Sequence, residues 1–386
     1  MNVLLLNGDN VQAVCFSRAL QNLSCRVTLL AEKKCTSGYA TRFVDEKILA
    51  PSIQNTVEFE AFFWDVVKTK SFHIIIPMGD ESADFLSKNK EIIEKDFGVH
   101  VAVPTYNIFE KANNKELLMQ LCKQYQLPHP KTVRLDASNL DSVIDYVGFP
   151  AMIKPNISAG AKGIVRVNNR EELETSFVGI EKDFGQCTLQ EYVEQPDYYY
   201  NVMLYRDRDG GYPAYTIIKI RRYFPLKGGS SCYSETIEHK SLLESCKTVL
   251  EKINWVGFAD FDVLEDINSG ELKIIEINPR VPSSLQASFA AGVNFAEVML
   301  NDMQGLKSPT YHYKVGQQVR WMGLDVMWFL FSPKRFSFSP SWFRFFGKNV
   351  SYHDGTWDNP LPMLAGMFAG VLKYLNPSFR KAKLQG

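Results

Sequence analysis

The chain has 386 residues, of which 45% are hydrophobic, and its 43 Lys and Arg side chains balance its 43 Asp and Glu side chains. This length exceeds that of one typical domain, so we expect two or three domains with a large buried core. Because the net charge is zero, no global field attracts nucleic acid, and we expect no nucleic-acid partner. Any charged ligand must be held by local side chains.

The seven cysteines are widely spaced and form no Cys-x-x-Cys pair, which argues against a disulfide framework or a thiolate metal site. The opening run MNVLLLNGDN is apolar and lacks a basic leader, so it indicates a β-strand and not a signal peptide. The late apolar run 361–375 is shorter than the roughly 20 residues that cross a bilayer. We therefore expect a cytoplasmic protein without a membrane span.

Residues 1 to about 103 alternate strand-like and helix-like stretches, as is typical of a parallel α/β unit. The strand-like runs are 3–6, 27–30, 74–77 and 99–103. The turn at 7–10 contains one glycine where a dinucleotide fingerprint needs three. The pattern favours a supporting Rossmann-like domain at 1–103, and a dinucleotide oxidoreductase is the weaker alternative.

A second domain is predicted for residues 104–308. It opens with a helical segment at 113–125, which Pro128 stops. A strand at 146–155 then carries Lys154 near its end, and a glycine-containing loop follows. Further strands are expected at 217–220, 257–265 and 272–278. Beyond residue 308 the composition becomes rich in aromatic residues, so we expect 309–386 to form a separate C-terminal extension.

A hairpin candidate carries the densest set of oxygen side chains. The turn formers at 266–270 separate two β runs, and this spacing sets Asp262 opposite Glu276 and Asp260 opposite Asn278. Oxygen ligands without His or Cys suit Mg²⁺ or Mn²⁺. We predict a metal site formed by Asp262, Glu276 and Asn278, and the alternative is an exposed polar sheet face without a ligand.

Two features beside the hairpin favour a ligand site. Pro279 ends the strand abruptly, and Arg280 places a guanidinium two residues after Asn278. A magnesium ion of this kind usually shares its remaining positions with phosphate oxygens, so a nucleotide is expected nearby. The candidate phosphate partners are Lys115, Lys154 and the loop 158–163.

The basic stretch at 219–231 is a further candidate. It contains four basic side chains, two glycines and two serines, and it can clamp an anionic substrate or a γ-phosphate by charge-assisted hydrogen bonds. Within it we favour Arg221 and Arg222. A solvated basic loop is the alternative.

The ordered set Lys115, Lys154 with its glycine loop, Gln190-Glu-Tyr-Val193, Asp262 and Glu276-Ile-Asn-Pro-Arg280 resembles the ATP-grasp superfamily. It is most similar to the synthetase domains of the carbamoyl-phosphate synthase large subunit, whose corresponding run also reads acid-x-Asn-Pro-Arg-Val, and to single-core carboxylate-amine ligases. The resemblance covers about residues 1 to 305. It implies an α/β, ATP-grasp fold with a Rossmann-like (pre-ATP-grasp) domain, a lid at about 131–189 and a C-terminal extension.

The resemblance also implies roles for individual residues. Lys115 and Lys154 would contact the ATP phosphates, and a loop containing Ser158, Gly160 and Gly163 would close over them. The segment from Glu191 to Val193 would hold adenine through backbone groups, and Asp197 falls where the family places a ribose-binding acid. The magnesium positions match Asp262, Glu276 and Asn278. Arg280 would steady the reacting phosphate or acyl phosphate, so Arg280 and Lys154 are the predicted catalytic residues.

The implied chemistry is ATP- and Mg²⁺-dependent ligation. ATP phosphorylates a small-molecule carboxylate, and an amine, or a thiol, then attacks the acyl phosphate. The chain is much shorter than carbamoyl-phosphate synthase and has one core, so carbamoyl phosphate is not the expected product. The alternative is a non-catalytic ATP-binding or scaffold protein that retains the fold.

The C-terminal extension suggests a partner of another kind. Its aromatic residues interleave with Lys334, Arg335, Arg344 and Lys348, and Arg380, Lys381 and Lys383 lie near the end. This mixture suits a peripheral contact with the inner face of a membrane. The alternatives are that these aromatic residues pack on the core or form a homodimer contact.

Overall fold

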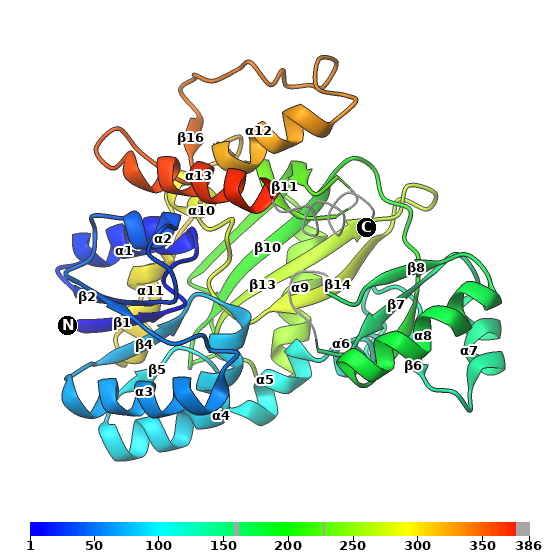
Figure 1. Ribbon diagram of the computed structural model, residues 1–386, viewed down its shortest axis with the longest axis horizontal. Helices are drawn as coiled ribbons and strands as arrows, with labels where there is room; N and C mark the ends of the chain where they lie inside the picture. Colours follow the sequence, from blue (N-terminus) through cyan, green and yellow to red (C-terminus); the bar gives the residue numbers. More distant parts are fainter. Residues whose placement is uncertain (158–161, 227, 376–386) are drawn as a thin grey trace.

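A computed structural model of the chain describes residues 1–157, 162–226 and 228–375. These residues form three β-sheets flanked by helices (Figure 1). The α/β fold class predicted from the sequence is confirmed.

The N-terminal sheet is parallel, with strand order β3-β2-β1-β4-β5. Its strands are β1 (Asn2–Leu6), β2 (Arg26–Ala31), β3 (Glu46–Leu49), β4 (Ile74–Pro77) and β5 (His100–Val101). Four helices connect them: α1 (Gln12–Asn22), α2 (Ser37–Ala40), α3 (Thr56–Thr69) and α4 (Asp80–Phe97). The central strands are continuous apolar runs because helices cover both faces of a parallel sheet. The carboxyl ends of β1 and β4 therefore point to one edge, where α4 begins.

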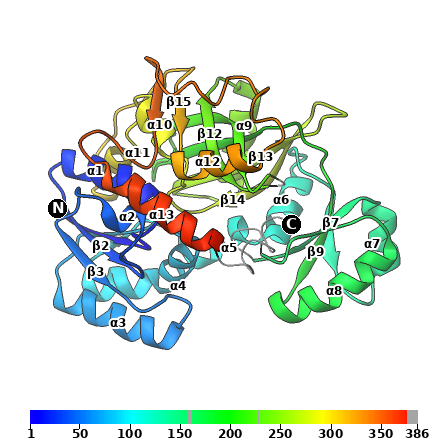
Figure 2. The same ribbon diagram turned by 45° about the horizontal axis from the view of Figure 1, so that its top comes forward.

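Two helices, α5 (Tyr106–Asn113) and α6 (Lys115–Gln124), lead to a small four-stranded antiparallel sheet of order β6-β9-β7-β8. Its strands are β6 (Thr132–Leu135), β7 (Ala151–Pro155), β8 (Val165–Val167) and β9 (Cys187–Glu191), with α7 (Leu140–Val147) and α8 (Arg170–Phe184). This sheet and its two helices bury an apolar cluster of their own. They project to one side of the molecule in Figures 1 and 2.

The third sheet has seven strands in the order β14-β13-β10-β11-β12-β15-β16. They are β10 (Tyr199–Arg206), β11 (Ala214–Phe224), β12 (Ser230–Thr236), β13 (Gly257–Glu265), β14 (Leu272–Asn278), β15 (Gln318–Arg320) and β16 (Val350–Tyr352). Helix α9 (Lys240–Lys252) packs in one apolar cluster with this sheet, and α10 (Gln286–Ala290) and α11 (Phe295–Met303) belong to the second cluster. The two apolar clusters therefore cover opposite faces of the sheet.

The chain beyond residue 308 is not separate from this sheet. Strand β15 pairs with β12, and β16 pairs with β15. Helix α12 (Met322–Phe331) packs against β11 and β12 through Trp328, Phe224 and Cys232. Helix α13 (Leu361–Leu375) lies beside α2 of the N-terminal part (Figure 2). The residues after 308 therefore add two strands to the seven-stranded sheet.

Among the helices in the described part of the chain, none combines the length and the apolar character that a membrane span requires.

Candidate active site

The β13–β14 hairpin has the register that the sequence predicted. Asp262 lies opposite Glu276, and Asp260 lies opposite Asn278. The connecting turn is tight because the Asp266 side chain accepts a hydrogen bond from the Asn268 backbone at 2.9 Å and the last turn residue is a glycine. Cross-strand partners share a face of the sheet, so the hairpin presents these oxygens together.

The neighbouring strand β10 holds Asp262 in place. Asn201 lies opposite Asp262 in the sheet, and its side-chain amide donates a hydrogen bond to Oδ1 of Asp262. Asn278 Nδ2 approaches the other oxygen, Oδ2, at 3.4 Å. Both carboxylate oxygens of Asp262 are thus oriented by amides, and Asn201 is a member of the cluster that sequence reasoning missed.

Two lysines from different elements converge on these carboxylates. Lys115, the first residue of α6, is buried, and its Nζ lies 3.5 Å from Oε2 of Glu276. Lys154, near the end of β7, is also buried, and the charges of Glu276, Lys115 and Asp262 affect its pKa. The Lys115 backbone amide donates to the Asn156 carbonyl at 2.9 Å, which joins α6 to the small sheet. The structure therefore brings together the two lysines and the acids that the sequence predicted.

Burial and nearby charges shift the pKa values of the three acids in different directions. Burial raises the pKa of Asp260 to about 8 and raises the pKa of Asp262 well above its usual value, and the Glu276 charge adds to both shifts. Burial also acts to raise the pKa of Glu276, but Lys115, a hydrogen bond from Asp262 and Lys154 together lower it to about 2. Asp262 therefore binds a proton more strongly than Glu276 does.

The ammonium of Lys154 is also perturbed. Burial lowers its pKa to about 8, and the charge of Glu276 opposes this shift. A buried lysine that is kept charged by one carboxylate is well suited to a polyanionic ligand, because such a ligand adds the negative charge that the site lacks.

Arg280 joins this cluster to the N-terminal sheet. Its Nε donates to Oδ1 of Asp80 at 2.8 Å, and its Nη2 donates to Oδ1 of Asn278 at 3.1 Å. Asp80 is the first residue of α4, directly after β4 and Gly79. Sequence reasoning missed Asp80, although an acid just past the carboxyl end of a buried parallel strand is a usable signal for a ligand site.

The oxygen donors fit a hard divalent cation. Asp262 and Glu276 face each other, and Oδ1 of Asp260 is buried without a hydrogen-bond partner. Within the described ranges, no three His, Cys, Asp or Glu side chains are grouped as a complete protein metal site. Mg²⁺ commonly takes one or two protein carboxylates and completes its shell with phosphates and water. Within the same ranges, Asp260 does not form a three-carboxylate metal group with Asp262 and Glu276.

The predicted phosphate loop is only partly described. Ser158 and Gly160 lie outside the described residues. Gly163 has a φ of +73°, and a Cβ there would come within 2.8 Å of the Phe184 ring and of Pro155. Packing and backbone conformation thus explain why residue 163 is a glycine. They do not depend on the predicted role of this loop in phosphate binding.

The last residue of β9, Glu191, anchors the start of the segment that follows the strand. Glu191 accepts hydrogen bonds from Lys273 Nζ at 2.7 Å and from the Lys131 backbone at 2.9 Å. Among the described residues, neither the backbone amide nor the carbonyl of Val193 has a protein partner. The Val193 side chain is buried. Asp197 is exposed and forms an ion pair with Lys334 of the C-terminal extension.

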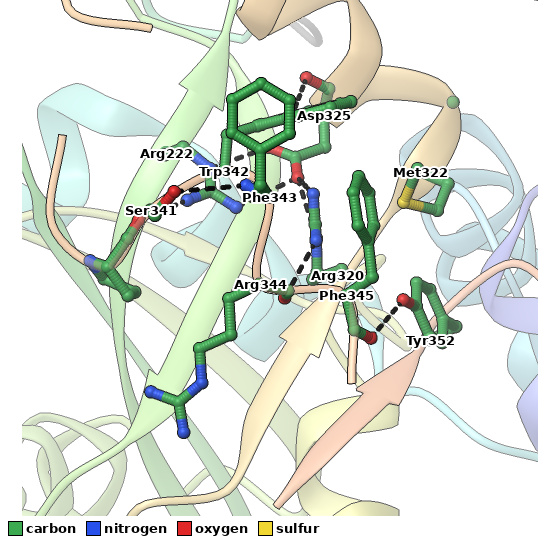
Figure 3. A network of polar contacts seen from close by, with 12 residues as sticks. Arg222, Arg320, Met322, Asp325, Ser341, Trp342, Phe343, Arg344, Phe345 and Tyr352 are labelled. Atoms are coloured by element: carbon green, nitrogen blue, oxygen red, sulfur yellow. Dashed lines mark hydrogen bonds and ion pairs between the residues drawn. The ribbon is translucent and has the colours of Figure 1, made fainter. Parts of the chain in front are cut away.

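The two predicted arginines of β11 lie apart from the carboxylates. Arg221 donates to Glu235 on the adjacent strand. Arg222 donates through Nε and Nη2 to the two oxygens of Asp325, at 2.7 and 2.9 Å, and only 1% of its side chain is exposed. Arg320 binds the same carboxylate (Figure 3). The structure does not bring Arg222 to a nucleotide, because its guanidinium is buried against the extension, and we leave Arg222 out of the proposed site.

The chain resembles proteins of one superfamily. Residues 210–323 match the family described as "ATP-grasp in the biosynthetic pathway with Ter operon". A D-aspartate ligase of Enterococcus faecium is 26% identical over 291 residues, which are 68% of this chain and 67% of the relative. The chain thus has a sequence relative over most of its length.

Two solved structures have a similar fold. The biotin carboxylase domain dimer of 2-oxoglutarate carboxylase from Hydrogenobacter thermophilus, in complex with MgADP, ADP and bicarbonate, has a TM-score of 0.66 and 15% identity over 82% of this chain and 73% of that one. An L-amino acid ligase from Bacillus licheniformis has a TM-score of 0.64 and 14% identity over 82% and 78%. The fold is the ATP-grasp fold. The chain is similar to ATP-grasp proteins in fold, and its residues 210–323 match an ATP-grasp family, in line with the resemblance of its motifs.

Proposed function

We propose that the protein is an ATP- and Mg²⁺-dependent carboxylate-amine ligase that acts through an acyl phosphate and releases ADP and phosphate. ATP-dependent formation of a C–N bond is the activity class to which its ligase relatives belong. The observation that carries the proposal is the meeting of Lys115 and Lys154 with Asp262 and Glu276 at the end of one hairpin. These residues are separated in the chain, and gathering buried charged groups in this way costs desolvation free energy.

The nucleotide would lie between the small sheet and the seven-stranded sheet. Lys115 and Lys154 would neutralise its phosphates, and the backbone of Val193 would bind the base, with Glu191 fixing that segment. Asp197 and Arg221 are exposed enough to approach a ribose or phosphate, and in this proposal each would first leave its present partner.

Mg²⁺ would be held by Asp262 and Glu276, with Asn278 as an additional oxygen donor. Bound there, the cation would supply charge neutralisation at the β- and γ-phosphates. Its binding would also remove the repulsion between the two acids, so that the proton on Asp262 would be released.

The chain's own residues account for the transfer. A substrate carboxylate oxygen attacks the γ-phosphorus, the bond to the β–γ bridging oxygen breaks, and ADP leaves with the electron pair. Lys154 neutralises charge as it spreads over the transferred group. An amine then attacks the acyl carbon, phosphate departs, and the ammonium proton passes to solvent or a nearby base. Arg280, oriented by Asp80 and Asn278, would stabilise the oxyanion of that second step.

The proposal has several further parts. The preferred nucleophile is an amine, and the alternative nucleophile is a thiol. We place the enzyme in the cytosol, acting on small molecules, with a homodimer and a peripheral membrane contact as further proposals. The alternative function, a non-catalytic ATP-binding scaffold, predicts nucleotide binding without turnover.

Phosphate release from MgATP tests the proposal. The purified chain is assayed with pooled amino acids, small dicarboxylates and sugar acids, beside Glu276→Gln. The matched control is Glu271→Gln, because Glu271 is exposed in the turn of the same hairpin. We expect one pool to stimulate release in the native chain and in the control but not in Glu276→Gln. Binding of MgATP without stimulation by any pool would favour the scaffold.

A further inference from the structure

Helix α13 presents an apolar face to solvent. Seven of its side chains are exposed, with between 37% and 69% of their surface accessible: Leu361, Leu364, Met367, Phe368, Val371, Leu372 and Leu375. They recur at intervals of three and four residues, which sets them along one side of an α-helix. Soluble surfaces rarely carry a contiguous apolar stripe of this length without a partner.

The other side of α13 is fixed to the protein. A Cβ on Gly366 would lie 2.3 Å from Oγ of Ser37, so the helix touches α2 at a position where only glycine fits. Met363 packs in the same way against Gly355. The helix also contacts α12. Because these contacts fix the orientation of α13, the apolar stripe is held facing outward and cannot turn into the core.

The charge of this region has one sign. From residue 359 to the end of the chain there is no Asp or Glu, and the sequence that follows the helix contains Arg380, Lys381 and Lys383. An apolar helical face that is followed in the sequence by basic residues is the composition of a helix that lies in the interface of an anionic membrane. A second copy fits poorly, because a symmetric contact through α13 would bring two basic, acid-free segments together.

We propose that α13 docks on an anionic lipid surface, lying in the interface with Leu364, Phe368 and Val371 inserted among the headgroups. The helix is too short to span a bilayer, so the contact is peripheral. The basic residues after the helix would strengthen it at low salt and would lose that effect as salt is raised. This inference concerns a surface distinct from the carboxylate cluster and holds whichever reaction the chain catalyses.

Flotation of the full chain with vesicles tests the proposal without nucleotide, so its outcome is independent of the ligase activity. The vesicles are phosphatidylcholine alone or phosphatidylcholine mixed with phosphatidylglycerol. We expect the native chain to float with the anionic vesicles, less so at high salt, and only weakly with the neutral ones. The variant Leu364→Glu/Phe368→Glu should bind the anionic vesicles at least about tenfold more weakly.

The matched control is Val57→Glu/Val178→Glu, which adds the same charge at two exposed apolar positions on α3 and α8. It should float like the native chain, and all variants should retain the native melting temperature. Failure of the native chain to float, or equal flotation of the α13 variant, would overturn the proposal. So would light scattering that shows a dimer in the native chain and a monomer in the α13 variant, with no vesicle binding by either.

Discussion

Replacing Asp325 with Ala should strongly destabilise the folded chain. Asp325 is fully buried and accepts four hydrogen bonds, two from Arg222 and two from Arg320 (Figure 3). Both guanidinium groups are at most 1% exposed. Removing the carboxylate leaves two buried cations without a counter-charge, which costs about 3–5 kcal/mol.

This cost corresponds to a measurable change in melting temperature. A chain of 386 residues has an unfolding entropy of roughly 0.8 kcal/mol/K, so a loss of about 4 kcal/mol lowers the melting temperature by about 5 °C if the chain unfolds as one unit. Calorimetry of the full chain measures this directly. Asp183→Ala, at an exposed position of α8, is the control and should melt like the native chain.

Arg222→Met decides between the structural role and the phosphate role that the sequence suggested. The structure predicts a lower melting temperature and an unchanged dissociation constant for MgATP, because the Arg222 guanidinium is committed to Asp325 and to the Pro340 carbonyl. Weakened MgATP binding at an unchanged melting temperature would refute this reasoning and return Arg222 to the nucleotide site.

Three further predictions follow from the site and its surroundings. Lys154→Met should lower kcat for phosphate release by at least about 100-fold, because one preorganised charge is lost at the transferring group. The same kcat in the variant and in the native chain would exclude a catalytic role for Lys154. Asp80→Asn should lower kcat by about tenfold with little change in MgATP binding, since it loosens Arg280; Asp84→Asn, which removes the partner of Lys88 on the same helix at the same 30% side-chain exposure, is its control. The pKa of Asp354 is raised by burial from 3.8 to about 6, so its stabilising contribution is complete below pH 3.8 and is lost as the pH rises through about 6. As the pH rises from 3.8 through about 6, the free energy of unfolding of Asp354→Asn should therefore increase by up to about 3 kcal/mol relative to that of the native chain. A difference in melting temperature between the two proteins that does not vary with pH would contradict this.

The sequence predicted the hairpin well because local rules determine it. Turn formers at 266–270 fix which residues face each other, and the alternation of a strand then places Asp262 and Glu276 on one face. Lys154 was found for a related reason, as it ends a strand beside a glycine loop. Short-range geometry was therefore enough for the core of the candidate site.

Other features depend on contacts that no local pattern reveals. Arg222 is neutralised by a residue 103 positions away, and Asn201 and Asp80 reach the cluster from other strands and helices. The sequence left three alternatives for the aromatic residues after 308: a membrane contact, packing on the core or a homodimer contact. Trp328 and Trp342 do pack around the buried arginines, whereas the exposed apolar face lies on α13. Which side of a uniformly apolar helix stays uncovered is a property of tertiary packing alone.

The most direct test of the central claim is calorimetric titration of ATP into the native chain, Glu276→Gln and Glu271→Gln, with and without Mg²⁺. If Lys115, Lys154, Asp262 and Glu276 form a MgATP site, the native chain and Glu271→Gln bind ATP tightly only with Mg²⁺, and Glu276→Gln loses the effect of the metal. No binding by the native chain, or binding that is the same for all three proteins whether or not Mg²⁺ is present, would contradict the account.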